Sequence, residues 1–240
     1  MSIISPHLCG RKIKPAMDKR CLQGVLFDLD GTLLDTAPDL IHACNTAVVE
    51  AGLEPQALPS LRPMISGGAY AMLKLTLNAN ARKADLDSLE ERMLSIYREN
   101  IAVHTQFFDG MGDVLDELES RGISWGIVTN KLSCFTDPLL ESLGLHTRSG
   151  CVISGDTLPE MKPHPMPMLE ACRRIGRSPT ACVYIGDARR DIEAGKNAGM
   201  ATLAALYGYI PENDPPHAWG ADGLLHQPSD LLAWLDGELA

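Results

Sequence analysis

The sequence lacks an excess of positive charge and, near its start, any long apolar segment. Its 240 residues carry 21 lysines and arginines against 31 aspartates and glutamates, a formal net charge of -10. This balance argues against a surface that binds nucleic acid or an anionic membrane. The first twenty residues hold no apolar segment long enough for a signal peptide or a membrane helix. We expect residues 1–21 to be a mobile tail without a function, or the product of a start upstream of Met17.

Paired cysteine motifs are also missing. The seven cysteines are irregularly spaced, and no two of them form a C-x-x-C pair. An odd and scattered set in a chain of this size indicates reduced thiols in a cytoplasmic protein. The cysteines are Cys9, Cys21, Cys44, Cys134, Cys151, Cys172 and Cys182.

The order of helical and strand patterns predicts an α/β fold with a helical insertion. No alternating strand pattern occurs between Thr36 and Val103, where we expect helices, whereas beyond Phe108 short apolar strands alternate with single helices. Such alternation predicts a doubly wound, Rossmann-like parallel sheet with right-handed crossovers. We expect a core domain at 22–36 and 104–240, with an all-helical domain inserted at 37–103. The core strands are expected at 25–27, 124–128, 151–154, 182–185 and 201–205.

The first strand ends in two acids one residue apart. Three apolar residues at 25–27 precede Asp28 and Asp30, and Gly31 and Thr32 follow. Gly31 lets the chain leave the extended conformation, so both acids can converge on one point. Two acids at one point repel each other and require a cation, a shared proton or solvent. The alternative is an exposed, aspartate-rich turn after an edge strand.

Polar residues also follow the later strands. Thr129 and Asn130 come directly after the second core strand, Lys162 precedes a proline after the third, and Asp187 and Asp191 follow the fourth. Each also has a simpler explanation when taken singly. Thr129 and Asn130 fit a turn, Lys162 fits a surface position, and Asp187 and Asp191 fit the cap of a helix. Since ligands of parallel α/β sheets bind at the carboxyl ends of the strands, we expect all of them at one site.

The stretch Asp28-Leu29-Asp30-Gly31-Thr32 resembles the Asp-x-Asp-Gly-Thr signature of the haloacid dehalogenase-like phosphatases. The later motifs match that family in the same order, and the resemblance covers nearly the whole chain from Gln23. It implies that Asp28 attacks phosphorus and that Asp30 protonates the leaving oxygen and later activates water. The phosphoryl group would be bound by Thr129, the Asn130 backbone and Lys162.

The resemblance further implies a Mg²⁺ site made of Asp28, the backbone carbonyl of Asp30, Asp187 and, directly or indirectly, Asp191. An oxygen-rich set of this kind suits Mg²⁺, which neutralises charge during phosphoryl transfer. Two residues depart from the family pattern. Ala188 replaces a polar or acidic residue that supports the metal ligands in many relatives, and His164 follows Lys162-Pro163 where Asp or Ala is common.

The helical insertion looks like the cap of that family, which closes over the nucleophile and selects the substrate. The cap candidates for specificity are Arg62, which could meet a substrate carboxylate, and Ser66, Gly67, Gly68 and Tyr70. The alternative is that the glycines only shape a turn. Several stretches look like the phosphoglycolate phosphatase branch, and most like the N-acetylmuramic acid 6-phosphate phosphatases.

The sequence therefore predicts a Mg²⁺-dependent phosphomonoesterase that acts on a small, acidic, phosphorylated metabolite. A phosphosugar mutase would share the same core and both acids of the first strand. A phospho-receiver module would also combine acids, a threonine and a lysine, but it needs no cap. We expect no nucleic acid and no membrane as partners, and a monomer or a homodimer.

Overall fold

The computed structural model describes residues 22–79 and 85–239. The predicted tail at 1–21, with Cys9 and Cys21, lies outside these residues. Within the described ranges, no helix combines the length and the apolar character needed to cross a membrane.

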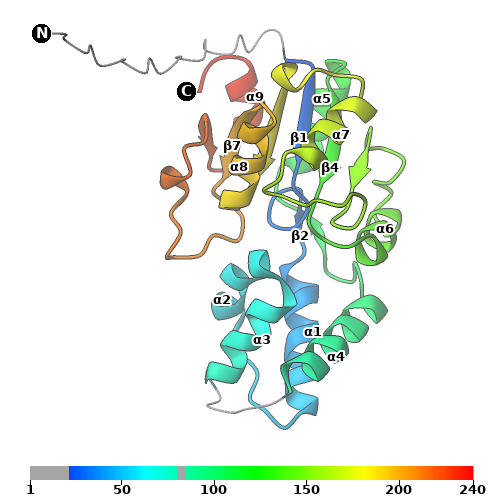
Figure 1. The fold of residues 1–240 in the computed structure, drawn as a ribbon, viewed down its shortest axis with the longest axis vertical. Helices are drawn as coiled ribbons and strands as arrows, with labels where there is room; N and C mark the ends of the chain where they lie inside the picture. The colour runs from blue at the N-terminus through cyan, green and yellow to red at the C-terminus, as the bar shows by residue number, and fades with distance from the viewer. Residues whose placement is uncertain (1–21, 80–84, 240) are drawn as a thin grey trace, which may run out of the picture.

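A parallel sheet of six strands forms the centre of the larger part of the molecule (Figure 1). The strand order is β5-β4-β1-β6-β7-β8, so the first strand of the chain lies in the middle. All four residues of β1 are buried, as expected of an apolar run with neighbours on both sides. The strands are β1 (Gly24–Phe27), β4 (Ser124–Val128), β5 (Val152–Ile153), β6 (Cys182–Gly186), β7 (Ala201–Ala205) and β8 (Gly223–Leu225).

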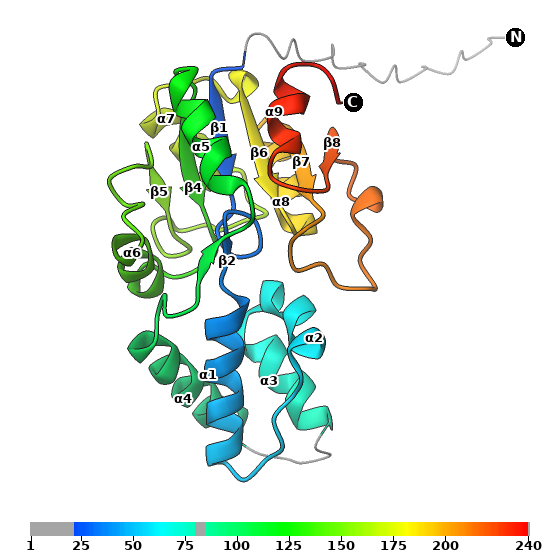
Figure 2. The same ribbon diagram turned by 180° about the vertical axis from the view of Figure 1, so that it is seen from behind.

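Helices cover both faces of this sheet (Figures 1 and 2). Phe27 packs on one face with residues of α5, α6 and α9, while its neighbour Leu26 packs on the other with residues of α7 and α8. The predicted doubly wound α/β fold is therefore confirmed. The helices are α5 (Met111–Ser120), α6 (Ser133–Ser142), α7 (Met166–Arg174), α8 (Arg189–Asn197) and α9 (Asp230–Leu235), with short 3₁₀ turns η3 (Pro179–Ala181) and η4 (Pro216–Ala218).

The predicted insertion is helical and has a buried cluster of its own, which packs beyond the carboxyl ends of the strands (Figure 1). Its first helix carries Pro38 in the first turn, and Gly52 follows its end with a φ of +71°. The elements are α1 (Ala37–Glu50), α2 (Leu58–Leu61), η2 (Arg62–Gly67), α3 (Gly68–Ala79) and α4 (Leu86–Glu99). The exact domain boundaries at 36/37 and 103/104 stay predictions.

Two short antiparallel strands join the insertion to the core. β2 (Leu34–Asp35) pairs with β3 (Gln106–Phe107) where the chain enters and leaves the cap. Two residues per strand are too few for an alternating pattern, so the sequence did not predict them. Phe135 and Tyr209 of the core also pack into the buried cluster of the cap. The cap and the core thus share apolar contacts around the junction.

Candidate active site

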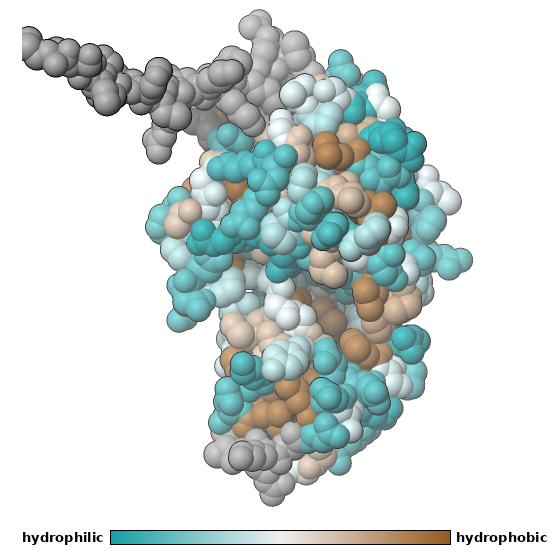
Figure 3. Space-filling model, viewed as in Figure 1, coloured by the Kyte–Doolittle hydropathy of each residue, from teal (hydrophilic) through white to brown (hydrophobic). Residues whose placement is uncertain are grey.

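A cavity of 430 Å³ lies between the carboxyl ends of β1 and β4 and the cap. The molecule is hollowed at this junction (Figure 3). Core residues on its wall are Asp28, Asp30, Thr129, Asn130, Lys131 and Arg190, and cap residues include Ser66, Gly67, Gly68, Glu90 and Tyr97. The structure therefore brings both predicted acids to one cavity, together with the residues that follow β4.

The chain makes a tight loop directly after β1. The backbone carbonyl of Leu29 accepts hydrogen bonds from the amides of Leu33 and Leu34, at 3.1 and 2.9 Å. Gly31 has a φ of +83°, and a Cβ at this position would collide with the carboxylate of Asp187. A glycine is required here by the backbone conformation and by the close approach of Asp187.

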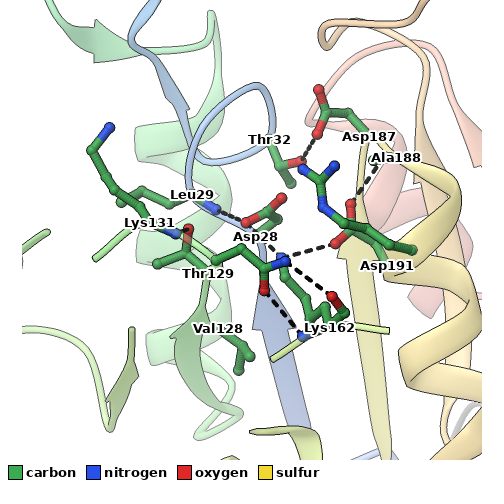
Figure 4. Close-up of polar contacts among 12 residues, drawn as sticks. Asp28, Leu29, Thr32, Val128, Thr129, Lys131, Lys162, Asp187, Ala188 and Asp191 are labelled. Carbon is green, nitrogen blue, oxygen red and sulfur yellow. Dashed lines mark hydrogen bonds and ion pairs between the residues drawn. The ribbon is translucent and has the colours of Figure 1, made fainter. Parts of the chain in front are cut away.

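Asp28 is buried at the end of β1. Its Oδ1 accepts a hydrogen bond from the amide of Leu29 at 2.7 Å and lies 2.8 Å from Nζ of Lys162. Burial raises the pKa of Asp28 to about 6, and the nearby Lys162 opposes this rise. The same lysine lies 2.8 Å from Oδ1 of Asp191, so one buried cation joins two acids (Figure 4).

Asp28, Asp187 and Asp191 form an acidic cluster. One carboxylate oxygen from each lies within 4.8 Å of the others, and all three residues are buried. Burial, together with repulsion by Asp28 and Asp191, raises the pKa of Asp187 to about 8. A cation placed among these oxygens would relieve the repulsion, and an all-oxygen donor set suits Mg²⁺. The residues present therefore fit the predicted metal.

Asp191 has two kinds of contact. Its Oδ2 accepts the amide of Ala188 at 2.9 Å at the start of α8, while its Oδ1 pairs with Lys162. The capping alternative for Asp191 is thus correct but incomplete.

The two residues that depart from the family pattern make no ionic contact with the described residues here. Ala188 offers only a buried methyl group to this region, and the exposed His164 accepts a hydrogen bond from the amide of Met166 through Nδ1 at 3.2 Å.

Asp30 contacts other groups than Asp28 does. Its Oδ1 accepts a hydrogen bond from Oγ1 of Thr36 at 2.6 Å and lies 2.7 Å from Nζ of Lys131. The carboxylate of Asp30 is not part of the acidic cluster of described residues. Asp30 is therefore contacted by a cation from the loop after β4 and by a hydroxyl from the start of α1.

The residues after β4 hold the loop that carries Lys162. The side-chain amide of Asn130 donates to the carbonyl of Lys162 and accepts its amide, both at 3.0 Å. Thr129 accepts the amide of Lys131 through Oγ1 at 3.1 Å. The sequence reasoning gave Asn130 only a backbone role and missed this clamp, because its partner lies 32 residues away.

The cap candidates divide into two groups. Ser66, Gly67 and Gly68 line the cavity, whereas Arg62 and Tyr70 do not. Arg62 is already paired with Asp35 at 3.0 Å, and the side chain of Tyr70 is half-exposed. The geometry therefore gives no support to the expectation that Arg62 meets a substrate carboxylate.

Four further cavity or junction residues were not among the predicted site residues. Lys131 follows the Thr129-Asn130 pair and could have been found from that motif. Arg190 lies between two predicted acids, and its Nη1 donates to the carbonyl of Ser66 at 2.8 Å. Tyr97 of the cap and Tyr209 of the core have no local sequence signal, because only tertiary packing brings them to this junction.

Comparison with known proteins identifies the family. The family model described as haloacid dehalogenase-like hydrolase matches residues 25–205. The chain belongs to the haloacid dehalogenase-like hydrolases. It is 46% identical over 218 residues to a phosphoglycolate phosphatase of Xanthomonas campestris pv. campestris, covering 88% of this chain and 97% of the relative. It is 39% identical over 218 residues to an N-acetylmuramic acid 6-phosphate phosphatase of Pseudomonas putida, covering 91% and 98% of the two chains.

A solved structure agrees with this assignment. A protein of Haemophilus somnus, described as a predicted phosphoglycolate phosphatase, matches with a TM-score of 0.80 at 25% identity, covering 89% of this chain and 98% of the other. The predicted family and its enzyme class, a phosphatase-type hydrolase, are confirmed. The roles of the individual site residues stay predictions.

Proposed function

We propose that this hydrolase is a Mg²⁺-dependent phosphomonoesterase that works through an aspartyl-phosphate on Asp28. The observation that carries the proposal is the position of Asp28. It is a buried carboxylate at the wall of the cavity, with a lysine ammonium at 2.8 Å and two further acids beside it. Phosphoryl transfer depends mainly on positioning and on positive charge near the phosphoryl oxygens, and this arrangement offers both.

Asp28, Asp187 and Asp191 would hold the Mg²⁺. When bound, the ion would neutralise charge on the phosphoryl oxygens and on the three carboxylates. The proposal is supported by the environment of the cluster, because burial above all, and repulsion between neighbouring carboxylates in addition, raise the pKa values of Asp28 and Asp187. The backbone carbonyl of Asp30 is proposed as a further ligand from the family resemblance.

In the first half-reaction, the carboxylate of Asp28 attacks phosphorus while Asp30 gives a proton to the leaving oxygen. Lys162 offsets the negative charge of Asp28 and of the phosphoryl group. Oγ1 of Thr129 accepts a hydrogen bond from the amide of Lys131. The hydroxyl of Thr129 is therefore free to donate its own hydrogen bond to a phosphoryl oxygen. In the second half-reaction, Asp30 removes a proton from water, which attacks the aspartyl-phosphate and restores Asp28.

The proposed substrate is a small acidic metabolite with one phosphoester, N-acetylmuramic acid 6-phosphate or 2-phosphoglycolate. Both names occur among the relatives, and both molecules carry a carboxylate. The cavity of 430 Å³ falls within the range of roughly 300–1,000 Å³ that is common for small-molecule sites. This volume supports a small-molecule substrate.

Replacing Asp28 with Asn tests the covalent mechanism. The change removes the nucleophile but little volume, so phosphate release in the presence of Mg²⁺ should fall to the level of a blank without enzyme while the thermal unfolding stays cooperative. The assay compares kcat/KM of the wild type and the variant for both proposed substrates. Turnover by the variant near the wild-type rate would contradict the mechanism.

The same assay separates the alternatives. A phosphosugar mutase would convert one sugar phosphate to another with no net release of phosphate. A phospho-receiver would keep its phosphoryl group without turnover across a panel of substrates. A hundredfold preference for one of the two acids, about 2.7 kcal/mol of differential transition-state binding, would decide the substrate. The cytoplasmic location and the monomeric or dimeric state stay predictions.

A further inference from the structure

Two basic side chains line the described wall of the cavity, and they lie beside different acids. Arg190 lies beside the acidic cluster and donates to the carbonyl of Ser66 in the cap. Lys131 instead places Nζ 2.7 Å from Oδ1 of Asp30. Under the proposed function, Asp30 meets the leaving oxygen. Of the two cations, Lys131 is therefore the one next to the part of the substrate that leaves.

The contacts of Asp30 are not those of an acid ready to give a proton. Its Oδ1 accepts from both Lys131 and Thr36, at 2.7 and 2.6 Å. A carboxylate oxygen that accepts two donors of this kind is not a proton donor. The contact with Lys131 must open, or the carboxyl group must turn, before Asp30 can protonate a leaving group from this oxygen.

Lys131 cannot simply be released into water. Its side chain is 8% exposed, and its ammonium lies 4.8 Å from the ring centroid of Tyr97 in α4 of the cap. Its ion pair with Asp30 at 2.7 Å is the contact that offsets this burial. Removing the partner of a buried ion is strongly unfavourable unless another group of the same charge takes its place.

We propose that Lys131 binds the carboxylate of the substrate, exchanging its ion pair with Asp30 for an ion pair with the substrate. The released Asp30 then performs the proton transfers of the proposed phosphoryl transfer, and the exchange itself makes and breaks no covalent bond. Lys131 is then a specificity residue in place of Arg62. This inference rests on the proposed function.

The exchange also restricts where the substrate carries its charge. Lys131 reaches Asp30 directly, so the carboxylate that replaces Asp30 must lie close to the bridging oxygen of the ester. An ester without such a group leaves the pair of Lys131 and Asp30 closed. It should bind through its phosphate but turn over slowly.

Replacing Lys131 with Met tests the exchange with two esters of equal carbon number. In the presence of Mg²⁺, kcat/KM should fall at least about tenfold for 2-phosphoglycolate, as expected for the loss of a charge-assisted hydrogen bond. For ethyl phosphate, which has no carboxylate, kcat/KM should not fall, because the change also frees Asp30 from its pair with Lys131. Lys131→Arg keeps the cation and should recover part of the selectivity. Lys196→Met removes an exposed lysine of α8 and should leave both values unchanged.

A binding measurement separates this inference from the proposed function. Calorimetric titration of Asp28→Asn with each ester, with and without Lys131→Met, needs no turnover. The second change should weaken binding of 2-phosphoglycolate at least about tenfold and leave ethyl phosphate unaffected. Equal effects on both esters, or unchanged binding of 2-phosphoglycolate, would overturn the role of Lys131. If the wild type bound 2-phosphoglycolate more tightly than ethyl phosphate but released no phosphate from either, the proposed function would be rejected. The role of Lys131 in binding a carboxylate would then still stand.

Discussion

The metal-free protein should lose stability as the pH rises, because Asp187 is buried among like charges. Burial and the neighbours Asp28 and Asp191 raise the pKa of Asp187 from its ordinary value of 3.8 to about 8. In the unfolded chain the group ionises near the ordinary value, so between these two pH values the folded state binds the extra proton. The stability contribution is thus complete below about pH 4 and is lost as the pH rises toward 8.

The size of the effect follows from the width of the window. Between pH 6 and the pKa of about 8 lie two pH units, and each unit corresponds to about 1.4 kcal/mol. The free energy of unfolding should fall by about 3 kcal/mol over this interval. For a chain of this length, each kcal/mol shifts Tm by roughly 2–4 °C, which gives a fall of roughly 6–12 °C. Asp28 titrates mainly below this interval, since its pKa is about 6.

Calorimetric unfolding of the wild type and Asp187→Asn in EDTA at pH 6, 7 and 8 measures this contribution. Asparagine keeps the volume but does not titrate, and groups common to both proteins cancel in the difference of their Tm values. The wild type should lose Tm relative to the variant as the pH rises. Saturating Mg²⁺ should remove the loss, because a bound cation favours the ionised carboxylate. A difference that is flat from pH 6 to 8 would refute the reasoning, as would a loss that Mg²⁺ leaves unchanged at pH 8.

Two further substitutions test the surroundings of the site. Lys162→Met leaves Asp28 and Asp191 without their shared buried cation, so we expect a destabilisation of about 3–5 kcal/mol and loss of turnover. Urea denaturation in Mg²⁺-containing buffer measures the destabilisation, and a denaturation midpoint equal to that of the wild type would contradict this expectation. Arg62→Ala should change KM for 2-phosphoglycolate and for p-nitrophenyl phosphate by the same factor, because Arg62 lies outside the cavity wall. If steady-state kinetics showed a rise in KM for 2-phosphoglycolate alone, Arg62 would have to contact the substrate carboxylate.

The core of the site was predictable because topology alone brings strand ends together. Asp28 directly follows an apolar strand, and Thr129 and Asp187 follow its two neighbours in the sheet. Once the alternation of strands and helices indicates a parallel sheet, the carboxyl ends of the central strands must lie along one edge. No knowledge of side-chain packing is needed for this step.

The cap residues were less predictable, because their positions depend on how helices rotate and pack. Arg62 was predicted for its charge, but it forms an ion pair with Asp35, which lies 27 residues earlier in the chain. Tyr70 was predicted together with the two glycines, and yet it is half-exposed on α3. Lys131 was visible in its motif, but its partner Asp30 lies 101 residues earlier. A local pattern states which residue types are present, whereas tertiary packing decides which of them pair.

The charges of the acidic cluster give a reason for the cation that the proposed function adds to Lys162. Lys162 pairs with Asp28 and Asp191. Among residues 22–79 and 85–239, Asp187 has no ion pair within 4.0 Å and accepts hydrogen bonds from the amide of Tyr209 at 2.7 Å and, at longer distance, from the hydroxyls of Ser66 and Thr32. Asp187 accordingly has the higher pKa of the two acids whose values are raised, about 8 against about 6 for Asp28. A phosphate ester brings further negative charge to the same place, and Lys162 and Arg190 together cannot offset the charge of the ester and of three carboxylates. It follows from the proposed function that the three carboxylates must be neutralised before the phosphate arrives, so we expect the substrate to bind weakly in EDTA.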